Sequence, residues 1–259
     1  MLQEEINIRE KIVAENNIPV ISIKGLYKSF GKDNDILKGV DLYVNEGENL
    51  VVLGKSGSGK SVTIKCMVGL VVADEGEIKV FGTSISNLNN TELNAIRIRI
   101  GFLFQNSALY DSMSVRQNLE FPLKRHTKKL SAAAIDTTVM EALENVGLVE
   151  AIDKMPAELS GGMRKRVGLA RTLILQPEVI LYDEPTTGLD TITSREISEL
   201  ILTIQKKYKT ASVIITHDMA CAKLTGDRIM ILKDGVIHAE GSYAELEKND
   251  DEWVRSFFI

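Results

Sequence analysis

Cysteine is scarce in this sequence: its 259 residues include only Cys66 and Cys221, and neither has a second cysteine nearby. This excludes a disulfide framework and a cysteine-based metal site, and it favours a reducing compartment. Long apolar runs are also missing, because the longest, such as Cys66–Ala73, fall far short of the roughly 18 residues that span a bilayer. The acidic start, Met1–Glu5, lacks the apolar segment of a signal peptide, so we expect none. A role at a membrane would therefore require a partner that spans it.

An excess of positive charge is absent as well. Lysine and arginine total 31 against 36 for aspartate and glutamate, which gives a formal net charge of −5. This argues against binding nucleic acid through overall charge, although a local basic patch stays possible. Hydrophobic residues make up 44% and charged residues 26%, as in soluble globular proteins, so the bulk of the chain is not disordered. The length suits one large domain or two small ones, and it suffices for a full core.

Short apolar runs with strand character alternate with helical patterns along the chain. The expected strands are Val20–Ile23, Asn49–Leu53, Glu77–Phe81, Gly101–Phe104, Val179–Tyr182, Ser212–Thr216 and Arg228–Leu232. Helical periodicity is clearest in 131–146, where Ser131 is positioned to cap the helix, and in 191–207. Several of the strands are almost wholly apolar, which is typical of a parallel sheet buried on both faces. We therefore expect an α/β fold, with a helical insertion at about 106–170.

A glycine-rich segment follows the apolar run Asn49–Leu53 and precedes a helix that begins near Lys60. It matches the phosphate-binding pattern G-x-x-x-x-G-K-[ST], with the residues Gly54, Lys55, Ser56, Gly57, Ser58, Gly59, Lys60 and Ser61. Its backbone N–H groups and the helix N-terminus would hold a triphosphate. We expect Lys60 to contact the β- and γ-phosphates and the Ser61 hydroxyl to bind Mg²⁺.

Two acids, Asp183 and Glu184, end the apolar strand Val179–Tyr182. An acid at such a strand end binds Mg²⁺ in phosphate-loop enzymes, and that role suits Asp183. Glu184 would then be placed to polarise a water molecule for attack on the γ-phosphate. Acids after a buried strand often only return the chain to solvent, but the phosphate loop favours catalysis here.

Further motifs, in order, resemble those of the ATP-binding cassette (ABC) ATPases. The segment Leu159-Ser160-Gly161-Gly162, before a basic helix, is similar to the family signature, and it precedes the acidic strand. Four other positions also match motifs of the family. Phe30 matches its adenine-stacking aromatic residue, and Gln105 matches the Q-loop glutamine. Asp190 matches the D-loop aspartate, and His217 matches the switch histidine. The resemblance covers roughly residues 20 to 245.

This resemblance implies a P-loop NTPase of ABC type, with a RecA-like core, the inserted helical subdomain and a small antiparallel β subdomain. It implies an ATPase domain at 18–246, after a polar extension at 1–17 and before a helical tail at 247–259. It further implies a dimer of two copies with two ATP molecules between them, each held by one chain's phosphate loop and the other chain's Ser160, Gly161 and Gly162.

The resemblance also assigns roles to single residues. Glu184, His217 and Lys60 would be catalytic, and Ser61, Gln105 and Asp183 would bind Mg²⁺. Phe30 would contact the adenine of ATP. Asp190 would lie at the subunit interface.

The signature carries Met163 where the family usually has glutamine, and methionine has no amide donor. This variation, with the ending Trp253–Phe258, resembles the Mla (MlaF-like) branch, which serves phospholipid transport. The resemblance implies MlaE-like permease subunits, an MCE-domain lipid-binding protein and a small regulatory subunit as partners. It implies a peripheral location on the cytoplasmic side of the inner membrane. The Gln105 loop and the insertion at about 106–165 would be the docking surface for the permease.

Three alternatives remain open. An amino acid, a lipoprotein or a peptide would be the cargo of a different transporter of the same class. A soluble ABC protein of iron–sulfur assembly would use the same nucleotide residues. A nucleic-acid-associated ABC protein would need a coiled coil, zinc modules or a second cassette, and none is visible in the sequence. We interpret Arg164, Lys165, Arg166 and Arg171 as a solvated helix face rather than a nucleic-acid patch.

Overall fold

The computed structural model describes residues 18–31, 34–127 and 130–258. The polar extension expected at 1–17 lies outside the described residues. A six-stranded sheet forms the centre, in the order β10-β9-β3-β8-β7-β6. All neighbours are parallel except β10 and β9, which pair antiparallel. The strands are β3 (Asn49–Leu53), β6 (Ile100–Leu103), β7 (Val179–Asp183), β8 (Ala211–Thr216), β9 (Arg228–Lys233) and β10 (Val236–Gly241).

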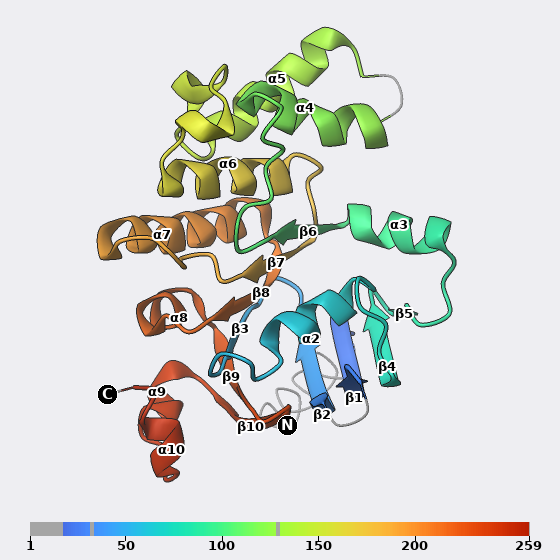
Figure 1. The fold of residues 1–259 in the computed structure, drawn as a ribbon, viewed down its shortest axis with the longest axis vertical. Coiled ribbons are helices and arrows are strands. Elements are labelled where there is room, and N and C mark those ends of the chain that lie inside the picture. Colours follow the sequence, from blue (N-terminus) through green and yellow to red (C-terminus); the bar gives the residue numbers. More distant parts are fainter. Residues whose placement is uncertain (1–17, 32–33, 128–129, 259) are drawn as a thin grey trace, which may run out of the picture.

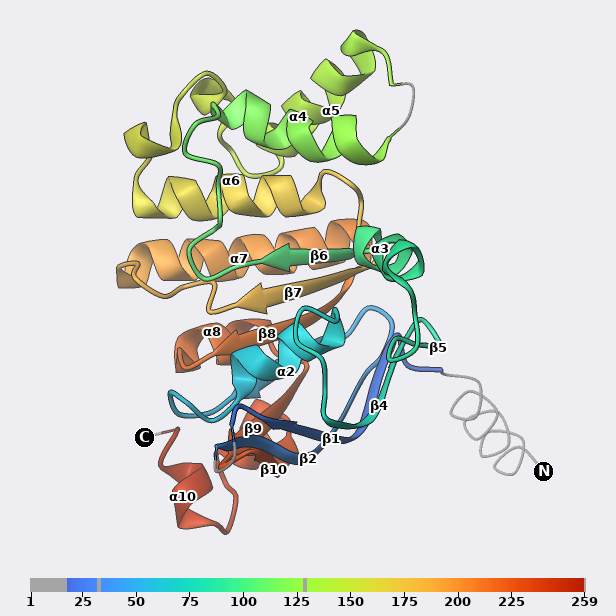
Figure 2. The same cartoon turned by 45° about the vertical axis from the view of Figure 1, so that its right-hand side comes forward.

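Every residue of β3, β7 and β8 is buried, because helices cover both faces of the sheet (Figure 2). Alternate residues of β3 divide between two hydrophobic clusters: Leu50 joins the cluster of α2, whereas Val51 joins the cluster of α7 and α8. These helices are α2 (Lys60–Met67), α7 (Thr191–Tyr208) and α8 (Met219–Thr225). The expectation of an α/β fold with a buried parallel sheet is confirmed.

A second sheet is antiparallel, in the order β2-β1-β4-β5. Its strands are β1 (Ile21–Ser29), β2 (Asp35–Val44), β4 (Glu75–Val80) and β5 (Thr83–Ser84). The strands β2, β5 and β10 were not predicted from the sequence. The long strand β2 and the edge strand β10 alternate between inward and exposed residues, so neither forms the continuous apolar run by which the central strands were found.

Between β6 and β7 the chain forms a group of helices with a hydrophobic cluster of its own, including Leu119, Leu143 and Val167. Figure 1 shows it stacked beyond the β6 edge of the sheet. Its elements are α4 (Val115–His126), α5 (Ala132–Glu144), the 3₁₀ turns Val149–Ala151 and Pro156–Glu158, and α6 (Gly161–Leu173). Ser131 caps α5, as predicted, by accepting a hydrogen bond from the N–H of Ala134. The remaining helices are α3 (Asn90–Ile98), α9 (Tyr243–Leu246) and α10 (Glu252–Arg255). In the part of the chain that the structure describes, no helix is both long and apolar enough to span a membrane.

The short helix α10 is anchored by Asp251. One carboxylate oxygen lies 2.7 Å from Nε2 of His238, and the other accepts a 2.8 Å hydrogen bond from the N–H of Trp253. The Trp253 ring packs edge-on against His238 and Phe257. The hydrogen bond with His238, followed by that from the backbone of Trp253, lowers the pKa of Asp251 below its ordinary value.

Because Trp253 is the only tryptophan, its fluorescence reports on this anchor. We expect Asp251→Ala to shift its emission maximum to the red at pH 7, and Asp251→Asn, which keeps a capping oxygen, to shift it less. A carboxyl with a lowered pKa stabilises the fold above its unfolded pKa of about 3.9, and that contribution is lost as the pH falls through the lower, folded value. Wild-type emission should therefore hold from pH 7 to about 4 and shift below it. An unchanged maximum in Asp251→Ala would contradict the anchor.

Candidate functional site: a phosphate-loop cleft at the carboxyl ends of the strands

The phosphate loop connects β3 to α2, as the sequence predicted. Gly59 is the N-cap of α2 and has a left-handed backbone with φ 105°. A Cβ on Gly59 would lie 2.6 Å from Cδ2 of Leu37 and 3.1 Å from the carbonyl oxygen of Ile36. Glycine is therefore required at this position both by conformation and by the close approach of β2. The constraint fixes where the N-terminus of α2 opens into the cleft.

The Lys60 side chain is buried at the first turn of α2 and points back into the loop. Its Nζ donates hydrogen bonds to the carbonyl oxygens of Gly54 at 2.7 Å and Lys55 at 3.1 Å. It also lies 3.9 Å from Oε1 of Glu184. Burial lowers the pKa of Lys60, while the charges of Glu184 and Asp183 oppose that change. A cation is thus held at the place where phosphate charge would be neutralised.

Ser61 and Asp183 meet at the wall of the cleft, where Ser61 is a lining residue. The Ser61 hydroxyl donates a 2.8 Å hydrogen bond to Oδ1 of Asp183, which is buried at the end of β7. A hydroxyl oxygen and a carboxylate oxygen this close together are the kind of ligand atoms that Mg²⁺ prefers. Gln105, two residues after β6, lines the same cleft and has an amide oxygen that can serve as a further metal ligand. The donor set therefore fits the Mg²⁺ site predicted from Ser61, Gln105 and Asp183.

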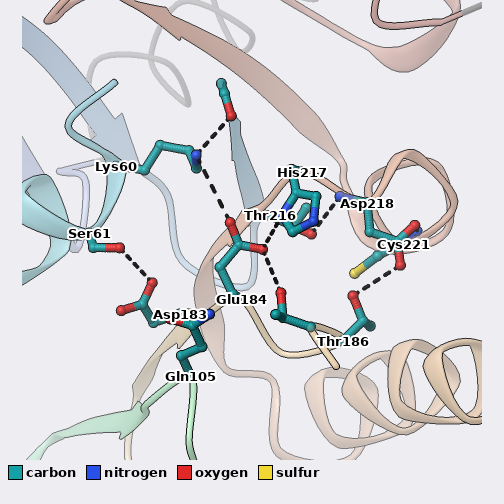
Figure 3. A network of polar contacts seen from close by, with 12 residues as sticks. Lys60, Ser61, Gln105, Asp183, Glu184, Thr186, Thr216, His217, Asp218 and Cys221 are labelled. Carbon is teal, nitrogen blue, oxygen red and sulfur yellow. Dashed lines mark hydrogen bonds and ion pairs between the residues drawn. The ribbon is translucent and has the colours of Figure 1, made fainter. Parts of the chain in front are cut away.

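Glu184 points away from Asp183, toward the switch histidine (Figure 3). Its Oε2 lies 2.7 Å from Nδ1 of His217 and accepts a 3.1 Å hydrogen bond from the Thr187 hydroxyl. Glu184 has a left-handed backbone with φ 52°, a conformation that costs a non-glycine residue about 1–2 kcal/mol. The two adjacent acids therefore have different partners: Asp183 faces Ser61, while Glu184 faces Lys60 and His217.

Beside these side chains lies a cleft of about 490 Å³, which Asp183 borders through its hydrogen bond with the lining residue Ser61. It is lined by residues from the phosphate loop and α2, by Ile36 of β2, and by Gln105, Glu184 and His217, which follow β6, β7 and β8. In parallel α/β sheets, ligands bind beyond the carboxyl ends of the strands, because connecting loops meet there. The structure thus gathers the predicted loop, metal and catalytic residues in one place.

The residues predicted for adenine stacking, the signature and the D-loop do not line this cleft within the single chain. Phe30 is about half exposed on the β1–β2 connection. Ser160 caps α6 by accepting a hydrogen bond from the N–H of Met163, and Asp190 caps α7 through Ile192 and Thr193. The predicted helix N-terminus at the signature is therefore present.

The two caps are also neighbours. A Cβ on Gly162 would lie 2.6 Å from Cγ2 of Thr193, and one on Gly161 would lie 3.3 Å from Leu189. The glycines thus let the start of α6 pack closely on the start of α7, which places the signature beside the D-loop residue Asp190.

The interpretation of the α6 basic residues as a solvated face is wrong for Lys165 and Arg171. Lys165 is only 5% exposed and donates hydrogen bonds to the carbonyl oxygens of Gln105 and Glu184. Arg171 donates to the carbonyl oxygens of Ser107 and Ala108. Their charge alone predicted that both side chains would be solvated, but both residues lie on the side of α6 that meets the chain after β6. Thr187 was also missed, since nothing in its spacing connects it to Glu184.

Comparison with known proteins agrees with this geometry. The family model described as "ABC transporter" matches residues 37–187. The chain is 42% identical, over 92% of its length, to the "Probable ribonucleotide transport ATP-binding protein mkl" of Mycobacterium leprae, and it spans 68% of that protein. It is 38% identical, over 96% of its length, to "Protein TRIGALACTOSYLDIACYLGLYCEROL 3, chloroplastic" of Arabidopsis thaliana, of which it spans 76%.

Among solved structures, the fold is similar to the ATP-binding cassette MJ0796 in a dimeric, post-hydrolysis state bound to ADP and Pi. The TM-score is 0.79 with 33% identity, covering 86% of this chain and 98% of that one. Another MJ0796 dimer, described as a bacterial ABC transporter cassette, gives a TM-score of 0.80 with 32% identity over the same shares. With its family model, its relatives and its phosphate-loop cleft, this chain belongs to the ATP-binding proteins of the ABC transporter family.

Proposed function

We propose that this chain is the ATP-hydrolysing motor of an ABC transporter that moves phospholipid or another hydrophobic compound. The observation that carries the hydrolytic part is the position of Glu184. Its carboxylate faces the cleft with His217 at 2.7 Å on one oxygen and Lys60 at 3.9 Å from the other. A carboxylate between a histidine and the phosphate-loop lysine is placed to orient an attacking water at the γ-phosphate.

In the proposed reaction each residue of the cleft has one task. The backbone N–H groups of 54–61 and the Lys60 ammonium bind the phosphates of ATP. Ser61, Asp183 and Gln105 would hold Mg²⁺, which when bound supplies charge neutralisation at the β- and γ-phosphates. Glu184 accepts a hydrogen bond from the attacking water and takes up its proton. His217 holds Glu184 in place and contacts the γ-phosphate.

The proposed ATP-binding unit is a dimer of two copies. Within one chain Ser160, Gly161, Gly162 and Asp190 lie outside the Lys60 cleft, yet they form a compact surface of two adjacent helix N-termini. In the dimer this surface would face the γ-phosphate of the ATP bound by the other copy. Phe30 would stack on the adenine of the ATP bound by its own chain. The solved MJ0796 dimers support this arrangement.

Transport requires permease subunits that span the membrane. We propose MlaE-like subunits, which place this chain peripherally on the cytoplasmic side of the inner membrane. The docking surface would be the Gln105 loop with the helical insertion, where Tyr110 and Leu130 are large and exposed. An MCE-domain protein and a small regulatory subunit would complete the complex. The Met163 signature and a relative named after the galactolipid trigalactosyldiacylglycerol support a lipid cargo.

Affinity purification of the tagged chain from native membranes in mild detergent tests this proposal. We expect a polytopic permease, an MCE-domain protein and bound phospholipid to co-elute. Co-elution of a permease with a solute-binding or lipoprotein-release partner would agree with the proposed motor function but contradict the lipid cargo. Co-elution of bound ribonucleotide in place of phospholipid would also contradict the lipid cargo, and one relative is named for ribonucleotide transport. Recovery only with soluble partners would contradict the transporter.

A further inference from the structure

Lys165 is buried without a carboxylate partner. The salt bridges among the described residues do not include it, and its Nζ donates instead to two main-chain carbonyl oxygens, of Gln105 at 2.5 Å and of Glu184 at 3.1 Å. Burial lowers the pKa of Lys165 to about 8, against the opposing charges of Asp183 and Glu184. Burying an ammonium on neutral acceptors costs desolvation free energy, and packing alone would be satisfied by an apolar side chain of similar length. The lysine therefore has a use beyond packing.

One acceptor of Lys165 belongs to a segment that α6 holds firmly. Ser107 and Ala108, two and three residues after Gln105, have left-handed backbones with φ of 58° and 48°. Arg171 donates to the carbonyl oxygens of both, at 2.8 and 2.9 Å. A Cβ on Gly168 would lie 2.9 Å from that of Ser107, so α6 also packs tightly on this turn. Residues 105–108 are thus fixed to α6 by two cations and should move with it.

The other acceptor belongs to the proposed catalytic residue. The N–H of Glu184 donates to the carbonyl oxygen of Ile215 in β8 at 2.9 Å, while its own carbonyl oxygen accepts from Lys165. These two bonds hold the left-handed conformation from which the carboxylate reaches His217. Lys165 therefore connects α6 directly to the backbone that aims the carboxylate. Figure 3 labels Gln105 and Glu184, the two residues whose carbonyl oxygens it contacts.

We propose that Lys165 is a positioning residue that couples the two ATP sites of the dimer. Ser160 caps the same helix five residues earlier, and in the dimer it would engage the ATP bound by the partner subunit. A shift of α6 on that engagement is passed through Lys165 to Gln105 and Glu184, which serve this chain's own ATP. Closure of the dimer on the ATP at one site thereby aligns the Glu184 carboxylate for hydrolysis of the ATP at the other site. This role rests on the proposed ATPase function.

Steady-state ATPase kinetics of Lys165→Met test this coupling. Methionine keeps similar length and removes both donors as well as the buried charge, so the fold should persist. We expect kcat to fall about 10- to 100-fold, because small misplacements of a catalytic group have effects of this size. KM for ATP should stay within about threefold and the Hill coefficient should fall toward 1, because phosphate binding is untouched while communication is lost. In a Glu184→Gln background, Lys165→Met should still form the ATP-dependent dimer.

Two further variants separate positioning from stability. Lys165→Arg retains donors for both carbonyls and should recover most of kcat. Arg166→Gln, one residue along α6, loses bonds that, among the described residues, go to Val146 and Glu196, and it should keep wild-type kinetics. Unchanged kcat in Lys165→Met, or a loss matched by Arg166→Gln and by a lower unfolding temperature, would overturn the coupling role. A wild-type chain that hydrolyses no ATP would overturn the proposed function itself, which distinguishes the two failures.

Discussion

Replacing Glu184 with glutamine is expected to lower kcat for ATP hydrolysis about a thousandfold while ATP binding remains. Glutamine has the same shape, so it can occupy the same left-handed position and still meet His217 and Thr187. It cannot take up the proton of the attacking water. Because the phosphate loop is unchanged, ATP still brings two copies together, and without hydrolysis they do not separate.

The measurement is phosphate release together with the molar mass in solution, with and without ATP and Mg²⁺. The variant should run as a dimer with ATP and as a monomer without it. Glu196→Gln is the matched control, because Glu196 is an exposed acid that pairs with Arg166 on the surface. Turnover of Glu184→Gln at the wild-type rate would show that another group activates water.

Replacing Lys60 with methionine is expected to weaken ATP binding about 10- to 150-fold, because charge-assisted hydrogen bonds worth about 1.5–3 kcal/mol are lost. The ammonium is buried and, among the described residues, it contacts two loop carbonyls and the Glu184 carboxylate, so its charge is poorly screened by solvent. Without it, the phosphates would face Asp183 and Glu184 with less compensating charge.

Titration with a fluorescent ATP analogue gives the dissociation constant, and thermal unfolding shows whether the variant is folded. Lys65→Met, on the same helix and outside the cleft, should bind as the wild type does. An unchanged dissociation constant for Lys60→Met in a folded variant would mean that the loop does not hold the phosphates. A loss of binding in both variants would point instead to damage of α2.

Local sequence was enough to predict the central strands and the phosphate loop, because each is specified by neighbours along the chain. The apolar run 49–53 forms β3 whether or not its partners are known, and the two glycines Gly57 and Gly59 supply the positive φ angles that the loop needs. Strands that alternate in exposure, such as β2, were missed because half of their residues are as polar as a loop.

The roles of Lys165 and Arg171 were decided only by the tertiary structure. Lys165 lies 60 residues from Gln105 along the chain, and nothing near it in the sequence shows that its ammonium reaches two carbonyls. A lysine on a helix is usually solvated, and burial here follows from how α6 packs on the turn after β6. The same holds for Asp183 and Glu184, which adjoin in sequence but contact different partners, Ser61 and His217. Sequence determined which chemistry is present; long-range packing determined which groups meet, because side-chain contacts depend on the positions of whole elements.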